Sequence, residues 1–163
     1  MQRIVLLSDT HNHLDQRIFS HLKKADQIWH AGDIGNITII DKLQEFAPTK
    51  VVYGNIDNYK IRQEFKRLLC FRCEKVKVLM THIGGYPGRY PTEIEELIIK
   101  NNPKIFISGH SHILKIIYDK KFNLLHLNPG SIGNHGFHKV KTLITFKING
   151  DKIYDLKIIE YER

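Results

Sequence analysis

Side chains of the types that bind metal ions occur in six short segments of this chain. The segments are Asp9-Thr10-His11, Gly32-Asp33, Gly54-Asn55, Thr81-His82, Gly109-His110-Ser111-His112 and Asn128-Pro129-Gly130-Ser131. One such segment alone would be ordinary turn chemistry, since Asp and Asn beside Gly are common in turns. The first five, however, each follow or end an apolar run typical of a β-strand. Ligands of open α/β sheets gather at the carboxyl ends of strands, so the placement predicts one shared site.

The chemistry of this set favours a pair of metal ions. Carboxylates suit hard cations, whereas imidazole suits borderline ions such as Mn, Fe, Co, Ni and Zn. The set contains no thiolate, which argues against a structural zinc site. Its donors exceed the needs of one ion but suit two ions, about 3.5–4 Å apart, that share a bridging carboxylate. They are two Asp, four His and one Asn: Asp9, His11, Asp33, Asn55, His82, His110 and His112.

A pair of ions of this kind indicates phosphoester hydrolysis. The two ions can clamp the attacking and the leaving oxygen of an in-line displacement, and they lower the pKa of a bridging water so that hydroxide can attack phosphorus. We expect two divalent ions, with Mn²⁺ first and Ni²⁺, Fe²⁺ or Zn²⁺ as alternatives. Taken singly, Asp9 and Asp33 could instead cap helices, and His82 or His110 could be a packing residue. Their joint placement at strand ends favours the metal site.

The elements that must position these residues alternate in the first half of the chain. Apolar periodicity predicts strands at 3–8, 27–30 and 51–53, with helices over 14–24 and 36–47 between them. Pro48 ends the second helix. Repeated strand–helix units of this kind favour parallel strands joined by right-handed crossovers.

The second half of the chain is richer in strands. A hairpin is predicted over 66–72 and 75–81, and Thr92 with Glu95 forms a capping-box pattern before a helix over 93–101. Further strands are expected at 104–108, 114–118, 122–127, 142–148 and 151–160, with Asn149-Gly150 as a hairpin turn. The order predicts an α/β fold of two packed mixed β-sheets flanked by helices, a four-layer α/β/β/α sandwich, as a single domain over 1–163.

The composition and net charge indicate which classes of binding partner suit this chain. The chain has 163 residues, 42% hydrophobic and 26% charged, which suits a globular domain with a sizeable core. The net charge of +8 suits a small anionic substrate, whereas the scattered basic residues support nucleic acid only weakly. No apolar run approaches a membrane span or a secretory leader, so we expect a cytoplasmic protein without a membrane partner. Homo-oligomerisation is left open. Cys70 and Cys73 are interpreted as packing residues of a strand.

The order of the motifs, D-x-H, G-D, G-N, H and G-H-x-H, resembles the calcineurin-like metallophosphoesterase superfamily. The short chain and the Asn128-to-Ser131 segment look like its small phosphodiesterase branch, which also includes the vacuolar sorting 29 type of retromer subunit. The resemblance implies that one group of residues holds the first metal, that Asp33 bridges, and that a second group holds the other metal. The first group is Asp9, His11 and His112, and the second is Asn55, His82 and His110. Asn55, His82 and Asp33 are then also the catalytic residues.

The chain departs from the larger members of that family directly after the G-N motif. Those proteins have a His there, which is read as the donor of a proton to the leaving oxygen, whereas this chain has Ile56. Ile56 cannot transfer a proton, so we expect a preference for esters with good leaving groups. Asp57 is interpreted as a structural residue of the turn.

Candidates for substrate contact are fewer. Arg89, in the glycine-rich loop after His82, could pair with a phosphate, with tyrosines of the same loop stacking on a base. A surface turn is the alternative. Asn128, Ser131 and His135 are further candidates for the pocket.

Two functions therefore compete. The leading hypothesis is a metal-dependent phosphoesterase that acts on small phosphodiesters with a metal-bridging hydroxide. The alternative is a non-catalytic interaction scaffold of the retromer-subunit type. Every expected ligand position carries a competent residue, which favours the enzyme.

Overall fold

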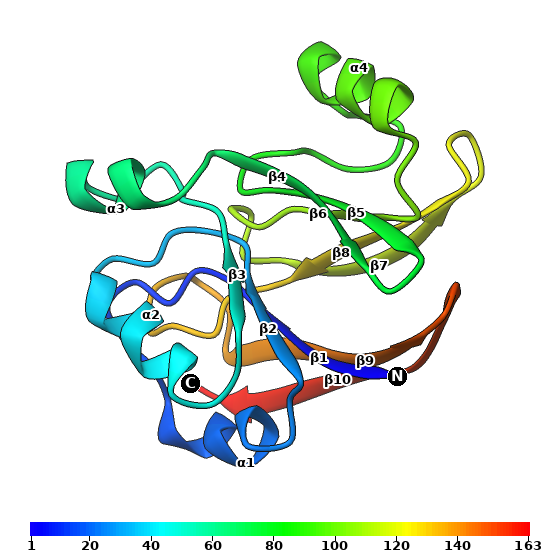
Figure 1. Cartoon of the computed structure of the whole chain (residues 1–163). Helices are drawn as coiled ribbons and strands as arrows, with labels where there is room; N and C mark the ends of the chain where they lie inside the picture. The colour runs from blue at the N-terminus through cyan, green and yellow to red at the C-terminus, as the bar shows by residue number, and fades with distance from the viewer.

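Two five-stranded mixed sheets face each other in the computed structural model, which describes residues 1–163 (Figure 1). The first sheet has the strand order β10-β9-β1-β2-β3 and the second has the order β4-β5-β6-β8-β7. The strands of the first sheet are β1 (Gln2–Leu7), β2 (Gln27–His30), β3 (Thr49–Val51), β9 (Val140–Asn149) and β10 (Lys152–Glu162). Those of the second are β4 (Leu68–Cys73), β5 (Val76–Thr81), β6 (Ile105–Ile107), β7 (Leu114–Asp119) and β8 (Leu124–Pro129).

Each sheet has three neighbouring parallel strands; the first sheet has one antiparallel hairpin and the second has two, β4–β5 and β7–β8. In the first sheet β1, β2 and β3 are parallel, and the β9–β10 hairpin adds to β1 in antiparallel register. In the second sheet β5, β6 and β8 are parallel, while β4 and β7 are antiparallel to β5 and β8. The chain thus ends with two hairpins in different sheets rather than with one meander, because β9 returns to β1.

Helices cover the outer faces of both sheets, which gives the predicted four layers (Figure 1). The helices α1 (Phe19–Leu22), α2 (Ile37–Gln44) and α3 (Tyr59–Glu64) contribute to an apolar cluster on the first sheet. The helix α4 (Thr92–Asn101) packs on the second sheet through Ile94 and Ile98. A third cluster, between the sheets, contains Trp29 and Phe146. None of the helices combines the length and the apolar character needed to cross a bilayer.

Several local predictions differ from the structure. The predicted helix over 14–24 is only a 3₁₀ turn, η1 (Gln16–Ile18), followed by the short α1. The helix α3 was not predicted at all. Thr92 is the first residue of α4 rather than its cap, since Pro91 occupies the capping position without a side-chain hydrogen bond. In the C-x-x-C, Cys73 is buried as expected, whereas Cys70 is exposed, because the two side chains point to opposite faces of β4.

All six parallel strands deliver their carboxyl ends to one edge of the molecule. Hydrogen bonds connect the loops that follow β1, β2 and β3. For example, Asp9 N–H donates to the Gly32 carbonyl at 2.9 Å. The loop after β6 joins them to the second sheet, because His110 N–H donates to Asp9 Oδ2 at 3.2 Å. Residues after β8 close the ring, since Gly133 N–H donates to the Asp9 carbonyl at 3.1 Å.

Candidate metal centre

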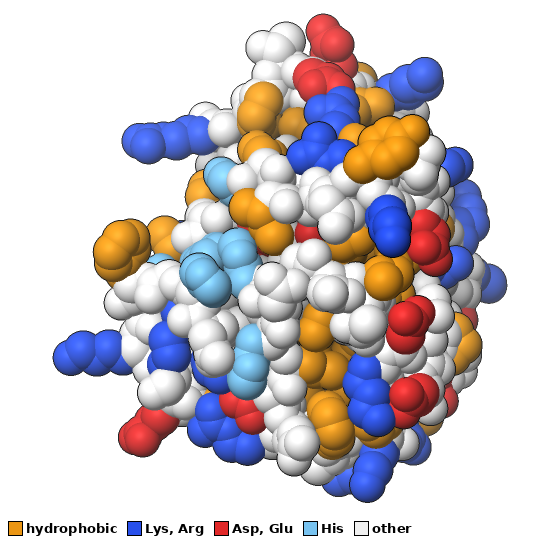
Figure 2. All heavy atoms as spheres, turned by 90° about the vertical axis from the view of Figure 1, so that its left-hand side faces the viewer, with side chains coloured by type: hydrophobic (Ala, Val, Ile, Leu, Met, Phe, Trp, Pro, Cys, Tyr) orange, Lys and Arg blue, Asp and Glu red, His pale blue; other side chains and the backbone are white.

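The predicted ligands converge at this edge as two adjacent groups. Within each group, one donor atom per residue lies within 4.8 Å of the others. The first group consists of Asp9, His11 and His112, and the second of Asp33, His82 and His110. A patch of His side chains is visible on the corresponding face of the molecule (Figure 2).

The first group is built around the Asp9 carboxylate. Its Oδ1 lies 3.0 Å from His112 Nε2 and 3.8 Å from His11 Nε2. The same His11 Nε2 lies 3.5 Å from Asp33 Oδ2. One oxygen of Asp33 therefore faces the first group.

The second group takes the other oxygen of Asp33. His82 Nε2 lies 3.2 Å from Asp33 Oδ1, and 3.1 Å from the amide oxygen of Asn55. The ring of His110 meets that of His82 edge to face, with centroids 5.3 Å apart. The two oxygens of Asp33 thus point to different groups, which is one arrangement in which a carboxylate can bridge two ions.

Five of the ligand residues have left-handed backbone conformations. Their φ angles are +56° at Asp9, +44° at His11, +55° at Asp33, +68° at His110 and +59° at His112. Such a conformation is unfavourable for residues with a Cβ atom, and it concentrates at functional sites where surrounding structure enforces it. Here the bonds between loops enforce it, and the result is that side chains from different strands turn toward one point.

Neighbouring groups leave the donor atoms free for ions. Asp9 Oδ2 accepts the Ser8 hydroxyl at 2.5 Å and the His110 N–H at 3.2 Å. By contrast, Asp9 Oδ1 and His11 Nε2 are buried with no hydrogen-bond partner. Buried polar atoms of this kind need a partner, and a cation supplies one. The donors of both groups therefore fit divalent ions of the borderline class.

The orientation of His82 is fixed from behind. Its Nδ1 lies 2.7 Å from the carbonyl oxygen of Ala31, so this nitrogen carries an N–H that donates to it, and Nε2 is the nitrogen that faces the site. Metal-ligating histidines are commonly held in this way, which sets the tautomer and the ring plane. Ala31 and Ser8 were missed in the sequence, because a backbone carbonyl and a serine after a strand carry no distinctive signal.

The charges of the site stabilise one another. Burial opposes ionisation of Asp9, but the imidazoles of His11 and His112 outweigh it and hold the Asp9 pKa well below its ordinary value. The pKa of Asp33 is also lowered, because His82 outweighs the effect of burial. Conversely, Asp9 raises the pKa of His11, and Asp33 raises that of His82 against its burial. The two carboxylates are therefore anionic at neutral pH, which suits cation binding.

Asp57 joins two of the site loops. Its Oδ1 accepts the N–H groups of Ile34 and Gly35, both at 2.8 Å, and its Oδ2 accepts that of Gly54 at 2.7 Å. The side chain is buried, so the structural interpretation of this residue fits. Ile56 N–H in turn donates to Asp33 Oδ1 at 3.1 Å, which orients that carboxylate.

The candidate substrate residues fall into two classes. Arg89 lines a cavity of about 200 Å³ together with His110, and the exposed His135 stacks on His11 with centroids 5.0 Å apart. Asn128 and Ser131, however, are buried, and they support loops instead of lining the surface. Asn128 donates to the Gly109 carbonyl at 2.9 Å and Ser131 donates to the Asp9 carbonyl at 3.1 Å. The structure thus gives these two residues a supporting role in the loops, and contact with substrate stays a prediction for them.

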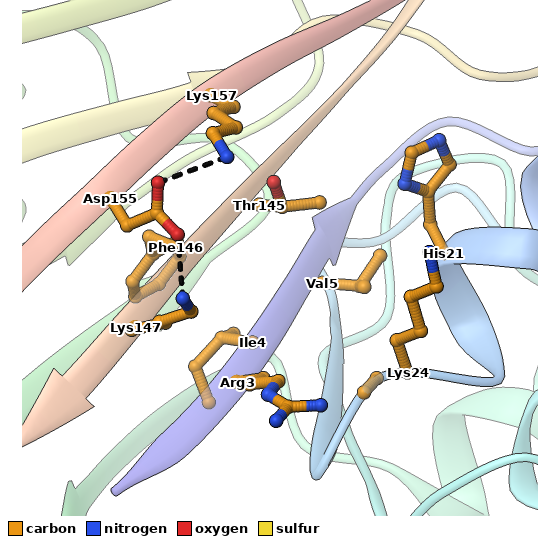
Figure 3. A pocket seen from close by; sticks show the side chains of 11 residues that line it. Arg3, Ile4, Val5, His21, Lys24, Thr145, Phe146, Lys147, Asp155 and Lys157 are labelled. Carbon is orange, nitrogen blue, oxygen red and sulfur yellow. Dashed lines mark ion pairs between the residues drawn. The ribbon is translucent and has the colours of Figure 1, made fainter.

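Another cavity lies away from the ligands, beside β1 and the β9–β10 hairpin (Figure 3). Its volume is about 120 Å³. Its acidic side chain, Asp155, is paired with Lys147 at 2.7 Å and with Lys157 at 3.0 Å. None of the candidate metal ligands lines it, so we assign the chemistry to the strand ends.

Comparison with known proteins agrees with this assignment. The sequence model of the calcineurin-like phosphoesterase superfamily domain matches residues 2–151, and the chain belongs to that superfamily. A probable metallophosphoesterase of Methanothermobacter thermautotrophicus is 30% identical over 136 residues, which cover 78% of this chain and 76% of that protein. A probable metallophosphoesterase of Methanocaldococcus jannaschii is 30% identical over 133 residues, covering 78% and 67%.

Solved structures share the fold at lower identity. The zinc complex of Vps29 from Entamoeba histolytica superposes with a TM-score of 0.75 at 17% identity, covering 98% of both chains. A predicted phosphoesterase of Streptococcus pneumoniae gives a TM-score of 0.69 at 21% identity, covering 99% of this chain and 98% of the other. These similarities define the fold, and the family assignment rests on the sequence matches.

Proposed function

We propose that the chain is a phosphodiesterase that depends on two divalent ions, with Mn²⁺ as the expected metal. The observation that carries the proposal is the convergence of all seven candidate donors at one edge, with the two oxygens of Asp33 facing different groups. When bound, such ions lower the pKa of a water molecule and stabilise negative charge on the phosphoryl oxygens. Asp33 would contribute to both ions, Asp9, His11 and His112 would hold the first, and Asn55, His82 and His110 would hold the second.

The side chains themselves orient the substrate. Asn55 is exposed and directs its amide oxygen toward His82, so its NH₂ group is free to donate to a phosphate oxygen. Ile56, whose exposed fraction is 45%, presents only hydrocarbon next to it. No acid therefore stands at this position to protonate the leaving oxygen, which supports a preference for esters such as aryl or nucleotide phosphodiesters.

The test is an activity screen of metal-free protein reloaded with Mn²⁺, Ni²⁺, Fe²⁺ or Zn²⁺. Phosphomonoesters and phosphodiesters with leaving groups of graded pKa are compared in parallel. We expect turnover of diesters that slows as the pKa of the leaving group rises. Asp33→Asn should lower kcat/KM by about a hundredfold or more, because one anionic ligand serves both groups. Asp151→Asn, at the exposed β9–β10 turn, is the matched control.

The rival function, a non-catalytic scaffold, is favoured only by the Vps29 fold neighbours. The scaffold hypothesis predicts no turnover of any phosphoester, even in protein that has been shown to bind the metal. That outcome would overturn the proposed enzyme. Equal rates across the leaving-group series would contradict the interpretation of Ile56.

A further inference from the structure

A basic cavity opens beside the second ligand group. Its volume is about 220 Å³, and its lining residues include two candidate metal ligands, Asn55 and His82, together with Tyr53, Arg62 and Arg67. No carboxylate is among its lining residues. The side chain of Ile83 separates it from the cavity that contains Arg89, since Ile83 lines both.

Arg62 is held in place by the loop that carries Asn55. Its Nε donates to the Asp57 carbonyl at 2.7 Å and its Nη2 donates to the Asn55 carbonyl at 2.9 Å. Its guanidinium carbon also lies over the Tyr53 ring, 5.2 Å from the ring centroid. A guanidinium has five N–H donors, so several remain free for an anion. The guanidinium is thus held by a direct hydrogen bond to the backbone of a candidate metal ligand, Asn55.

Arg67 provides the second positive charge of the cavity. Its backbone is anchored, because Thr81 Oγ1 donates to the Arg67 carbonyl at 3.1 Å. Its guanidinium pairs with Glu93 on α4, and the two side chains are 57% and 58% exposed. A pair this exposed contributes little to stability, so Arg67 can exchange Glu93 for a substrate anion.

We propose that this cavity binds a second phosphate group of the substrate, apart from the phosphodiester that is cleaved. The inference rests on the proposed function and deepens it: the preferred substrates are nucleotide-like diesters that carry an additional phosphomonoester. Two guanidinium groups match the double negative charge of a phosphomonoester, and each can bind it with two hydrogen bonds. Tyr53 and Ile83 supply apolar surface for the part of the substrate that joins the two phosphates.

The test compares two chromogenic substrates that differ only in the additional phosphate. They are thymidine 5′-(4-nitrophenyl phosphate) and the same compound phosphorylated on its 3′ oxygen. In both, the oxygen of water forms a bond to the 5′ phosphorus and gives a proton to solvent, while the bond to the aryl oxygen breaks and 4-nitrophenolate leaves. We expect the 3′-phosphate to raise kcat/KM of the metal-loaded protein by about tenfold or more, the contribution of a charge-assisted hydrogen bond.

Arg67→Ala should remove most of this advantage, so that kcat/KM for the two substrates becomes nearly equal, because one of the two guanidinium groups that would bind the additional phosphate is lost. Arg62→Lys, which keeps the charge but loses the forked geometry, should reduce the advantage as well, with unchanged metal affinity as the check that the loop is intact. Arg72→Ala, at the far end of β4, is the control for net charge and should keep the full advantage.

Equal kcat/KM for the two substrates, or an advantage that persists in both arginine variants, would overturn the inference while the hydrolase stands. If no metal-loaded form hydrolysed either substrate, the proposed function itself would fail.

Discussion

At the scale of single residues, the two fully buried histidines of the strands behave differently. His30 has partners, because its Nε2 lies 3.0 Å from Thr10 Oγ1 and its Nδ1 accepts the Gly32 N–H at 3.1 Å. His126 has none for either ring nitrogen. It packs among aromatic rings, with centroids 5.5 Å from Phe106 and 5.6 Å from Tyr86. Burial lowers the pKa of His126 from 6.5 to about 4, against the opposing charge of Asp119.

This environment predicts a loss of stability in mild acid. The unfolded chain binds a proton at His126 below pH 6.5, whereas the folded protein resists it until about pH 4. The free energy of unfolding is therefore not reduced by His126 above pH 6.5. It falls as the pH decreases from 6.5 toward 4, because the unfolded chain then binds a proton that the folded protein does not. Between pH 7 and pH 5 the loss amounts to about 2 kcal/mol. Urea unfolding of the wild type and of His126→Phe at both pH values measures it.

The variant should be within about 1.5 kcal/mol of the wild type at pH 7, because phenylalanine fills a similar volume among the same rings. It should lose about 2 kcal/mol less than the wild type at pH 5. His138→Gln, which removes an exposed histidine, is the control and should follow the wild type. Identical pH dependence in the wild type and His126→Phe would contradict the assignment.

At the scale of elements, the sequence predicted the long strands and the convergence of their ends, since apolar runs of β1 and β5 are unambiguous. It missed α3, because Ile61 is the only buried residue of this short helix and gives no periodicity. It also could not show that Asn128 is buried under the loop after β6. The basic cavity was equally hidden: Arg62 and Arg67 come together only because α3 and the start of β4 fold beside Asn55.

The tight contact between the loops after β2 and β3 gives a prediction at Gly54. A Cβ atom there would lie 2.0 Å from Asp33 Oδ1 and 2.4 Å from Asp33 N. Gly54→Ala must therefore displace the Asp33 carboxylate. We expect it to destabilise the fold by about 1–3 kcal/mol and to weaken metal binding at least tenfold, as measured by calorimetric titration with Mn²⁺.

Gly150→Ala is the control for Gly54→Ala, because it introduces backbone strain without displacing the Asp33 carboxylate. Gly150 has a φ of +62°, and a Cβ atom there would meet nothing within 4 Å. This variant should cost about 1–2 kcal/mol of stability through its left-handed backbone and leave metal affinity unchanged. Wild-type affinity in Gly54→Ala would show that Asp33 is not a ligand.

At the scale of the whole molecule, the candidate ions would join the two sheets. The first group takes Asp9 and His11 from the first sheet and His112 from the second, and the other group takes Asp33 from the first sheet and His82 and His110 from the second. Binding to the folded state alone stabilises it by mass action. We expect Mn²⁺ at about 100 times its Kd to raise Tm by about 5–10 °C, as measured by scanning calorimetry.

Chelation with EDTA should reverse this rise, and Asp33→Asn should abolish most of it. Mg²⁺ at equal concentration is the control, because imidazole-rich sites favour transition metals. A Tm that does not respond to any of the four transition metals would rule out the metal centre.

The mixed origin of both groups also has a consequence for a chain that is still on the ribosome. Until residue 110 has emerged, neither group has all three of its members, however well the early strand–helix units have formed. A nascent polypeptide accordingly offers at most two members of each group, which make a weaker site than three. Metal therefore binds after the complete tertiary structure has formed, and it stabilises fully synthesised molecules rather than incomplete chains.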